Sequence, residues 1–285
     1  MTLVAVRDNP DMSKKPKPEP VVPPETPAQR EDPDFVTAVA RGFAILRCFK
    51  RGERALGNKD MATRTGLPRS TIARLTHTLT ELGYLEYLPS QEKYALGIPV
   101  LSFGQAYLTG LDLRDVARPQ MQDLANEVKG TVSLAGRSGD DMMFLELAHG
   151  NPTFALRVSV GERVPRGTSA LGRAYSGALP PEERERNLQM FKRTVPKGAW
   201  AAAEASVREG YAEYEQYGVC LSLGDWNPDV HAVSTPMVSA DGHKIVAFSA
   251  SFPAHMADRR LLLEEIAPKL KAMRDRISHQ LGGVF

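Results

Sequence analysis

Residues 66–85 read GLPRSTIARLTHTLTELGYL, and this stretch decides the fold of the N-terminal part of the chain. Pro68 suits the first turn of a helix, because the N–H that proline lacks would have no partner there. Apolar residues then recur at spacings of three and four, which predicts a helix with one buried face. The positions expected on that face are Ile72, Leu75, Leu79 and Leu82. Gly83 is expected to end the helix.

Two further helices are expected before this stretch and a hairpin after it. From Phe35, apolar residues at helical spacing predict an amphipathic helix of three to four turns. Asn58 is expected to cap a short helix over Lys59–Thr65. Residues 84–88 and 93–96 alternate like two strands around a polar turn. Three helices and a hairpin in about sixty residues are typical of a winged helix-turn-helix.

The positive charge of the chain is concentrated in the same segment. Residues 35–97 hold 10 Lys or Arg against 5 Asp or Glu, a local charge of +5, in a chain whose formal net charge is +2. Such a concentration is expected of a module that contacts phosphates, although a solvated basic surface would look the same. Together with the tight turn and the wing, the charge favours double-stranded DNA as the partner.

The N-terminal end of the second helix of a helix-turn-helix enters the major groove of DNA. Arginine bonds guanine there, and serine or threonine bonds phosphates or base edges. The candidate DNA-binding residues are Arg69, Ser70, Thr71, Arg74 and His77, with Lys93 in the wing. The alternative is a small helical domain that binds protein, with the two arginines as solvated surface charges.

Composition shifts divide the rest of the chain. Residues 1–34 hold 8 of the 21 prolines and predict a disordered or polyproline-like tail, with a docking arm as the alternative. The winged helix-turn-helix is placed at residues 35–97. Residues 98–115 form a linker helix, which could also pack against a dimer partner. Residues 116–285 form a second, larger domain.

That larger domain alternates predicted helices and strands. Helices are expected at residues 116–128, 168–178, 181–192 and 199–210, with an amphipathic helix closing the chain. Strands are expected at residues 131–136, 142–148, 154–160, 219–223, 231–238 and 244–252. The predicted fold class is α+β, with a curved and mostly antiparallel sheet.

The motifs of common enzymes are incomplete. Residues 167–172 have the spacing G-x-S-x-x-G, which differs from the G-x-S-x-G of a nucleophile elbow. Arg173 and Ala174 stand where a phosphate-binding loop requires lysine and a hydroxyl residue. The six histidines are scattered, so neither a metal site nor a cofactor is expected. The sequence therefore argues against an enzyme.

The remaining composition indicates a soluble cytoplasmic protein. Cys48 and Cys220 each lie in an apolar run, which favours reduced thiols in the core over a redox switch. No apolar run reaches the length of about 18 residues that a transmembrane helix needs, so no membrane partner is expected. The first ten residues lack the pattern of a secretory leader.

Several separated motifs resemble the IclR family of bacterial transcription regulators. They are FVTAVARGFAILR at residues 35–47, GLPRST at 66–71 and LTELGY at 79–84, then VGERVP at 160–165 and TSALGRA at 168–174. The opening segment is most similar to members that regulate aromatic-acid catabolism. Two places depart from the family pattern: residues 58–60 at the start of the second helix, and LGDWNP at residues 223–228.

The resemblance implies a domain that binds a small effector in a cup between the curved sheet and the helix that begins near Thr168. The effector-binding residues carried over by motif or by strand alternation are Phe154, Leu156, Ala170, Leu171, Ser222, Ala232, Ser249 and Ser251. Exposed N–H groups at a helix N-terminus favour a carboxylate ligand. Ser249 and Ser251 share one face of a strand, and their hydroxyls either contact this ligand or only satisfy backbone groups.

The expected function is that of a ligand-responsive, sequence-specific regulator of a catabolic operon that senses a small organic carboxylate, with aromatic acids among the candidates. The resemblance implies a dimer or a tetramer on a near-palindromic operator. The alternative is a DNA-binding protein that responds to no effector, although a domain of about 170 residues beyond the DNA head argues for a sensor.

Overall fold

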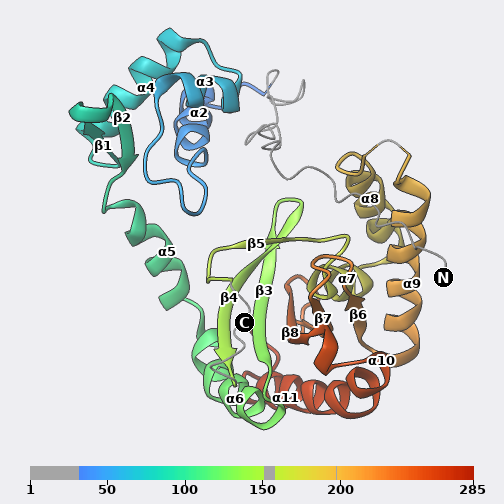
Figure 1. Cartoon of the computed structure of the whole chain (residues 1–285). Helices are drawn as coiled ribbons and strands as arrows, with labels where there is room; N and C mark the ends of the chain where they lie inside the picture. Colours follow the sequence, from blue (N-terminus) through green and yellow to red (C-terminus); the bar gives the residue numbers. More distant parts are fainter. Residues whose placement is uncertain (1–31, 151–157, 197) are drawn as a thin grey trace, which may run out of the picture. The chain divides into compact units, whose positions relative to one another are not determined.

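The computed structural model describes residues 32–150, 158–196 and 198–285. The chain divides into two compact units between Gln105 and Ala106. Most of the proline-rich segment at residues 1–34 lies outside the described residues. Figure 1 shows the elements of both units, coloured along the sequence.

The N-terminal unit contains three helices followed by a two-stranded antiparallel hairpin, which confirms the predicted winged helix-turn-helix fold. Its elements are α2 (Thr37–Leu46), α3 (Asn58–Thr65), α4 (Arg69–Glu81), β1 (Leu85–Leu88) and β2 (Lys93–Leu96). Their apolar faces enclose a small core around Ile45, Met61 and Ile72. Gly66 has φ 70°, a left-handed conformation that glycine adopts without steric cost, and it ends α3 just before α4 begins.

Two local details of this unit differ from the prediction. Asn58 is the first residue of α3 and does not cap it. The carboxylate of Asp60 accepts a hydrogen bond from the N–H of Gly57 at 3.0 Å and closes the first turn instead. Leu82 is 61% exposed, because it follows the last turn of α4 and no longer lies on its buried face.

An ion pair clamps the loop that joins α2 to α3. The guanidinium of Arg64 bonds both carboxylate oxygens of Glu53, one of them at 2.7 Å, and it also donates to the carbonyl of Cys48 at 2.7 Å. Arg64 therefore fixes this loop against α3.

The predicted single linker helix is wrong. The structure has α5 (Val100–Thr109) and, after a break, α6 (Asp112–Val128). Leu111 at the break is extended, with φ −103° and ψ 90°. Acidic residues then occupy the first turn of α6, where the helix dipole favours negative charge. The second domain's first helix therefore begins earlier than the predicted Val116.

The C-terminal unit is built on a six-stranded sheet in which every pairing is antiparallel. Its strands are β3 (Thr131–Ser138), β4 (Asp141–His149), β5 (Arg163–Pro165), β6 (Cys220–Leu223), β7 (Val230–Val238) and β8 (Ile245–Pro253). Their order across the sheet is β5-β4-β3-β8-β7-β6. The mostly antiparallel sheet expected from the sequence is thus confirmed.

Helices cover both faces of this sheet (Figure 1). One face is covered by α6 and α11 (Ala267–Gln280). The other face is covered by α7 (Ala170–Gly177). Two further helices, α8 (Pro181–Lys192) and α9 (Trp200–Tyr217), pack against α7. A short turn α10 (Arg259–Leu261) and a π-helical turn (Leu262–Ile266) lead into α11. Pro268 follows that π-helical turn and has no N–H to continue a regular ladder.

The residues on the two faces of the sheet differ in size. On the face toward α6 and α11 lie large apolar side chains such as Leu134, Val233 and Phe248. On the face toward α7 the alternate positions of the same strands are small, for example Ala135 and Ala247. We call these the packed face and the α7 face. The α7 face therefore has room beneath α7 that the packed face lacks.

Two predicted elements of this unit differ from the structure. Residues 151–157 of the predicted strand 154–160 lie outside the described residues, and residues 158–160 are not in a strand. Among the described residues, β4 pairs with β3 on one side and with the short β5 on the other, where Arg163 is opposite Met143. The helix predicted to end at Gly210 continues to Tyr217.

Candidate functional site

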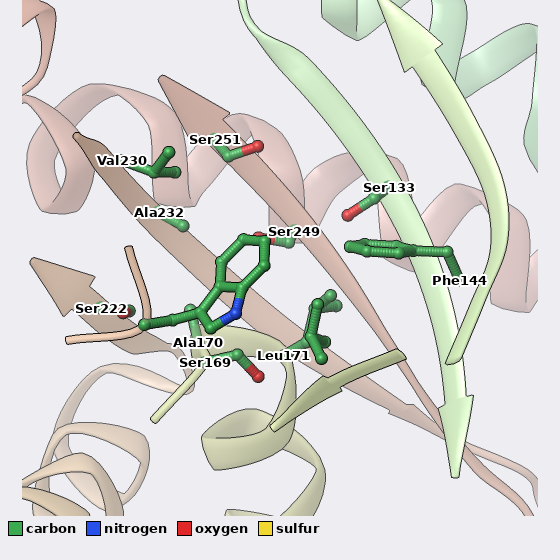
Figure 2. Close-up of a pocket in the computed structure, with 12 residues that line it drawn as sticks. Ser133, Phe144, Ser169, Ala170, Leu171, Ser222, Val230, Ala232, Ser249 and Ser251 are labelled. Atoms are coloured by element: carbon green, nitrogen blue, oxygen red, sulfur yellow. The ribbon is translucent and has the colours of Figure 1, made fainter. Parts of the chain in front are cut away.

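The α7 face and the start of α7 enclose a pocket, shown in Figure 2. It contains about 370 Å³ of empty space, part of which is open to solvent. Its lining comes from all six strands, from α7 and from the segment between β6 and β7: Ser133, Phe144, Val164, Ser169, Ala170, Leu171, Ser222, Trp226, Val230, Ala232, Ser249 and Ser251. None of these described lining residues carries a charge.

Six of the residues expected in the effector site lie together in this pocket. They are Ala170, Leu171, Ser222, Ala232, Ser249 and Ser251. The other two, Phe154 and Leu156, lie outside the described residues.

Three of the pocket serines use their hydroxyl protons on the backbone. Ser222 donates to the carbonyl of Thr168 at 3.0 Å, Ser249 to Val233 at 3.1 Å, and Ser251 to Thr131 at 3.2 Å. Ser249 and Ser251 therefore satisfy backbone groups, which leaves open whether they also contact a ligand. Each oxygen keeps lone pairs, so these serines offer the pocket hydrogen-bond acceptors.

The donors come from the start of α7. Ser169 caps the helix: its hydroxyl accepts from the N–H of Gly172 at 3.1 Å and donates to the carbonyl of Pro165 at 2.6 Å. Among the described residues, no acceptor lies on the N–H groups of Ala170 and Leu171, which both line the pocket. Free N–H groups and the helix dipole make this end of the pocket suitable for an anion.

A β-bulge keeps the carboxylate of Glu146 in β4 away from the α7 face. Leu134 is opposite Glu146 and Ala135 is opposite Phe144, so β4 has one extra residue, Leu145. Phe144 lies in the pocket, whereas the carboxylate of Glu146 meets Arg114 of α6 at 2.8 Å. Strict alternation would instead place Glu146 on the same face as Phe144. The bulge thus removes a negative charge that would repel an anionic ligand.

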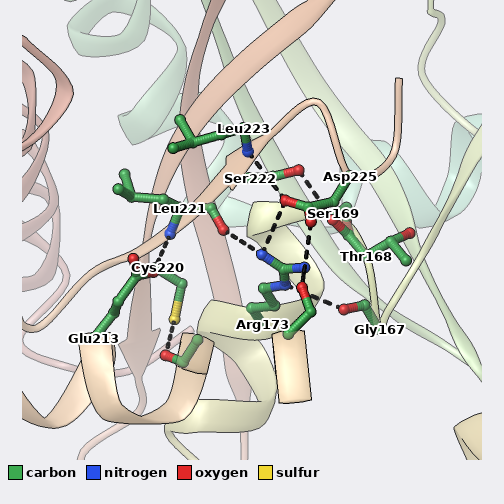
Figure 3. A network of polar contacts seen from close by, with 12 residues as sticks. Gly167, Thr168, Ser169, Arg173, Glu213, Cys220, Leu221, Ser222, Leu223 and Asp225 are labelled. Atoms are coloured by element: carbon green, nitrogen blue, oxygen red, sulfur yellow. Dashed lines mark hydrogen bonds and ion pairs between the residues drawn. The ribbon is translucent and has the colours of Figure 1, made fainter. Parts of the chain in front are cut away.

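A buried arginine ties three walls of the pocket together (Figure 3). Arg173, which is 5% exposed, donates to the carbonyls of Gly167 at 3.2 Å and Leu221 at 2.8 Å. It also bonds the hydroxyl of Ser206 at 2.7 Å and the carboxylate of Asp225 at 3.2 Å. The loop before α7, strand β6 and the β6–β7 segment are therefore held by a single guanidinium.

Opposing effects act on the carboxyl group of Asp225. Burial raises its pKa, but the charge of Arg173 and the hydrogen bonds from Arg173, Leu223 and Ser206 outweigh burial and hold the pKa below its ordinary value. Asp225 is therefore ionised at neutral pH and completes an ion pair with Arg173.

Close packing around α7 depends on glycine. A Cβ atom on Gly172 would lie 2.2 Å from the carbonyl oxygen of Arg166, and one on Gly210 would lie 2.9 Å from Cδ of Arg173. Gly172 is therefore required, because a larger residue would collide with the backbone of the loop after β5. This close approach holds the start of α7 next to the pocket.

The two cysteines are free and buried, as expected from the sequence. Burial raises the pKa of Cys48 to about 11 and also raises the pKa of Cys220. Cys220 donates its S–H to the carbonyl of Gly210 at 3.1 Å. Both thiols are therefore protonated at neutral pH and are weak nucleophiles.

The second candidate site is the outer face of α4. Arg69, Ser70, Arg74 and His77 are exposed, and Thr71 is half-buried at the first turn. The buried positions of the helix are Ile72, Thr76 and Leu79. Lys93 is half-buried at the start of β2. The structure thus leaves the polar residues at the N-terminal end of α4 accessible, as a helix that enters a DNA groove requires.

Sequence reasoning missed half of the pocket. The missed residues are Ser133, Phe144, Val164, Ser169, Trp226 and Val230. Ser133 is directly opposite Ser249 in the ladder, so a known register would have found it. Predicting that Phe144 faces the pocket requires knowing where the bulge lies in β4. Trp226 lies in a connecting segment, and no hydrophobic periodicity predicts the path of such a segment.

The fold and the two sites together define a transcription regulator with a DNA-binding head and a sensor domain. The IclR helix-turn-helix domain matches residues 38–89, and the bacterial transcriptional regulator IclR C-terminal domain matches residues 105–279. The chain belongs to the IclR family. Within the described ranges, no helix combines the length and apolarity needed to cross a membrane.

Individual relatives agree with this assignment. The HTH-type transcriptional regulator TsaQ1/TsaQ2 of Comamonas testosteroni is 30% identical, over 90% of this chain and 93% of that protein. The crystal structure of an IclR family transcriptional regulator from Brucella abortus is 37% identical, with a TM-score of 0.84 over 93% of this chain and 100% of that one. These relatives are regulators, which confirms that the chain is not an enzyme.

A third protein has been solved with a ligand. An IclR homolog from Microbacterium hydrocarbonoxydans, complexed with 4-hydroxybenzoate, shares the fold with a TM-score of 0.64 at 24% identity. The match extends over 84% of this chain and 100% of the Microbacterium chain.

Proposed function

We propose that this regulator senses a small aromatic carboxylate that carries a second polar group able to donate a hydrogen bond. The observation that supports this proposal is the division of the pocket into a donor end and an acceptor wall. The N–H groups of Ala170 and Leu171 suit a carboxylate. The serine oxygens of the sheet suit a hydroxyl, because their own protons are already used.

Between these polar ends the pocket is apolar. Phe144 and Trp226 lie among its lining residues, with Leu171 and the methyl of Ala232. Aromatic side chains favour an aromatic ring at centroid separations of about 4.5–7 Å. A planar ring with a carboxylate at one end and a hydroxyl at the other therefore matches the lining better than a short aliphatic acid does.

Titration calorimetry on the full chain tests this ligand class. The reference ligand is 4-hydroxybenzoate. Benzoate lacks its hydroxyl, 4-hydroxybenzyl alcohol lacks its carboxylate, and pyruvate lacks its ring. We expect 4-hydroxybenzoate to bind tightest and the alcohol to bind weakest or not at all. Equal binding of all four compounds, or heat from none of them, would rule out the proposed ligand class.

We also propose that α4 reads the operator, with Arg69, Ser70, Thr71, Arg74 and His77 at the major groove and Lys93 on a phosphate. The exposure of Arg69, Ser70, Arg74 and His77 on α4 supports this assignment. Replacing Arg74 with alanine should cost about 1–3 kcal/mol on the specific site and little on scrambled DNA. Replacing Lys93 with alanine should weaken binding to the specific site and to scrambled DNA alike. It should also lower the slope of log K against log salt concentration by about 1.

We further propose that the chain forms a homodimer or a homotetramer on a near-palindromic operator beside a catabolic operon, and that it acts in the cytoplasm where the DNA lies. Large apolar side chains on α2 and at the start of α5 are exposed, including Phe43 at 55%, Leu101 at 73% and Phe103 at 52%. Such unpartnered apolar surface marks an interaction site. Light scattering should give the mass of a dimer or tetramer for the wild type, and a smaller species for Leu101→Glu.

A further inference from the structure

We propose that Trp226 is a movable wall of the pocket through which ligand enters, and that the ion pair between Asp225 and Arg173 is the latch that keeps it closed. This inference rests on the proposed function only in taking the pocket as the effector site. Trp226 is partly exposed, lines the pocket and packs against the core of the α7 face.

The position of Trp226 in the chain distinguishes it from the rest of the lining. Every other described lining residue belongs to a strand or to the start of α7. Trp226 alone lies in the segment between β6 and β7, three residues after the last residue of β6. Connecting segments open at lower free energy than the strands beside them. Trp226 is therefore the part of the wall that moves most easily.

The latch is rigid on one side and accessible to water on the other. The guanidinium of Arg173 is fixed by the carbonyls of Gly167 and Leu221, and its side chain is 6% exposed. The side chain of Asp225 is 32% exposed, and its partners include Arg173 and the N–H of Leu223 at 3.1 Å (Figure 3). Opening therefore means that Asp225 leaves Arg173 for water, which solvates its carboxylate.

The ends of the segment are anchored, so the motion is confined. The N–H of Gly224 donates to the carbonyl of Val230 at 3.2 Å, and the N–H of Val230 donates to Asn227 at 2.9 Å. Gly224 has φ 88°, a conformation that favours glycine and suits a hinge. Asp225 and Trp226 are neighbours beyond this hinge, so release of the carboxylate also releases the indole.

A wall of this kind selects ligands by shape. When the latch is closed, the indole of Trp226 forms one side of the cavity, and a ligand fits only if it packs against that ring. A flat aromatic acid restores the closed state after entering, whereas a branched aliphatic acid of similar volume holds the latch open. The latch thereby links ligand shape to the state of the β6–β7 segment.

The test uses the fluorescence of Trp226. The chain has two tryptophans, so Trp200→Phe makes Trp226 the only one. In that background we compare acrylamide quenching of Asp225→Ala with Asp229→Ala, a matched control in the same segment. We expect the quenching constant to rise about twofold or more in Asp225→Ala, because the lost ion pair enlarges the open population. Asp229→Ala should match the parent.

The same variants are tested with 4-hydroxybenzoate as the probe. Dissociation measured by stopped-flow should be about three- to tenfold faster in Asp225→Ala, because the closed state no longer retains the ligand. If the wild type binds no acid of the panel, the proposed ligand class fails, but the quenching comparison still decides the latch. Equal quenching of the two alanine variants contradicts the inference, whatever the ligand.

Misfolding is controlled by a second variant. Asp225→Asn keeps the size of the side chain but removes its charge and replaces one acceptor oxygen with an NH2 donor. We expect intermediate quenching at an unchanged melting temperature. If quenching rises only in variants whose melting temperature falls, the Asp225–Arg173 pair is merely structural and the latch is refuted.

Discussion

The packed face and the α7 face of the sheet are made by the same strands, but one is filled by core side chains and the other borders the pocket. Val132, Leu134 and Phe248 point from β3 and β8 to the packed face, where they are completely buried under α6 and α11. Their neighbours Ser133 and Ser249 point to the α7 face, where they line a cavity. One face is filled by large apolar side chains, and the other keeps space for a ligand.

The difference shows how one strand supports both stability and binding. Alternate residues of a strand point to opposite faces, so residue size can be chosen independently on each face. Three small polar residues on the α7 face are buried yet satisfied, because Ser222, Ser249 and Ser251 bond backbone carbonyls. The cavity is thus tolerated because hydrophobic stabilisation comes mainly from the packed face.

The largest expected effect tests that division of roles. Phe248→Ala should lower the free energy of unfolding by about 3–5 kcal/mol, because it opens a cavity in the packed face. Ser249→Ala, on the next residue, should change it by no more than about 1 kcal/mol. Urea denaturation measures both. Similar losses for the two variants would remove the distinction between the faces.

The second prediction fills the cavity. Ala232→Leu should lower the affinity for 4-hydroxybenzoate by about 100-fold, because its side chain takes the ligand's space, with a small change in stability. Ala247→Leu is the matched control, since Ala247 lies on the same face but is fully buried outside the pocket lining. That control should cost about 1–3 kcal/mol of stability. Unchanged calorimetric affinity in Ala232→Leu would place the ligand elsewhere.

The third prediction concerns the acceptor wall. Replacing Ser222, Ser249 or Ser251 with alanine one at a time should weaken 4-hydroxybenzoate by about tenfold in at least one variant, the value of one hydrogen bond. Binding of benzoate should not change in that variant, because it has no hydroxyl to donate. Calorimetry with both acids provides the comparison, and equal losses for the two acids would argue against an acceptor role.

The smallest expected effect is the pH dependence of the latch. The folded pKa of Asp225 lies below its ordinary value, so its contribution is complete above about pH 4 and is lost as the pH falls through the lowered pKa. Acrylamide quenching of Trp226 should be constant from neutral pH down to about pH 5 and rise only in more acidic solution. A rise near neutrality would assign the change to another group.

The sequence predicts most of the elements because their signals are local. The helix after Pro68 and the strands near Ser249 follow from apolar spacing, and the structure contains both. The errors occur where a non-local contact or a single residue determines where an element begins or ends. Leu82 fits the helical period yet lies beyond the last turn, and Leu111 breaks a helix that composition alone would continue.

The pocket is predictable only in part for the same reason. Motif and alternation locate Ala170 and Ser251, which need no knowledge of pairing. Ser133 depends on the register between β3 and β8, and Phe144 depends on the bulge at Leu145. Trp226 depends on the path of a segment fixed by the network around Arg173. These features are set by tertiary contacts that a single sequence does not encode locally.

The most direct test of the account is fluorescence anisotropy with the intergenic DNA beside the protein's own gene and a scrambled control, with and without 4-hydroxybenzoate. The account predicts tight binding to the native fragment alone, and a shift in that affinity when the acid is added. Equal and strongly salt-dependent binding to both DNAs, unaffected by any acid of the panel, would reduce the interaction to phosphate contacts and contradict a ligand-responsive, site-specific regulator.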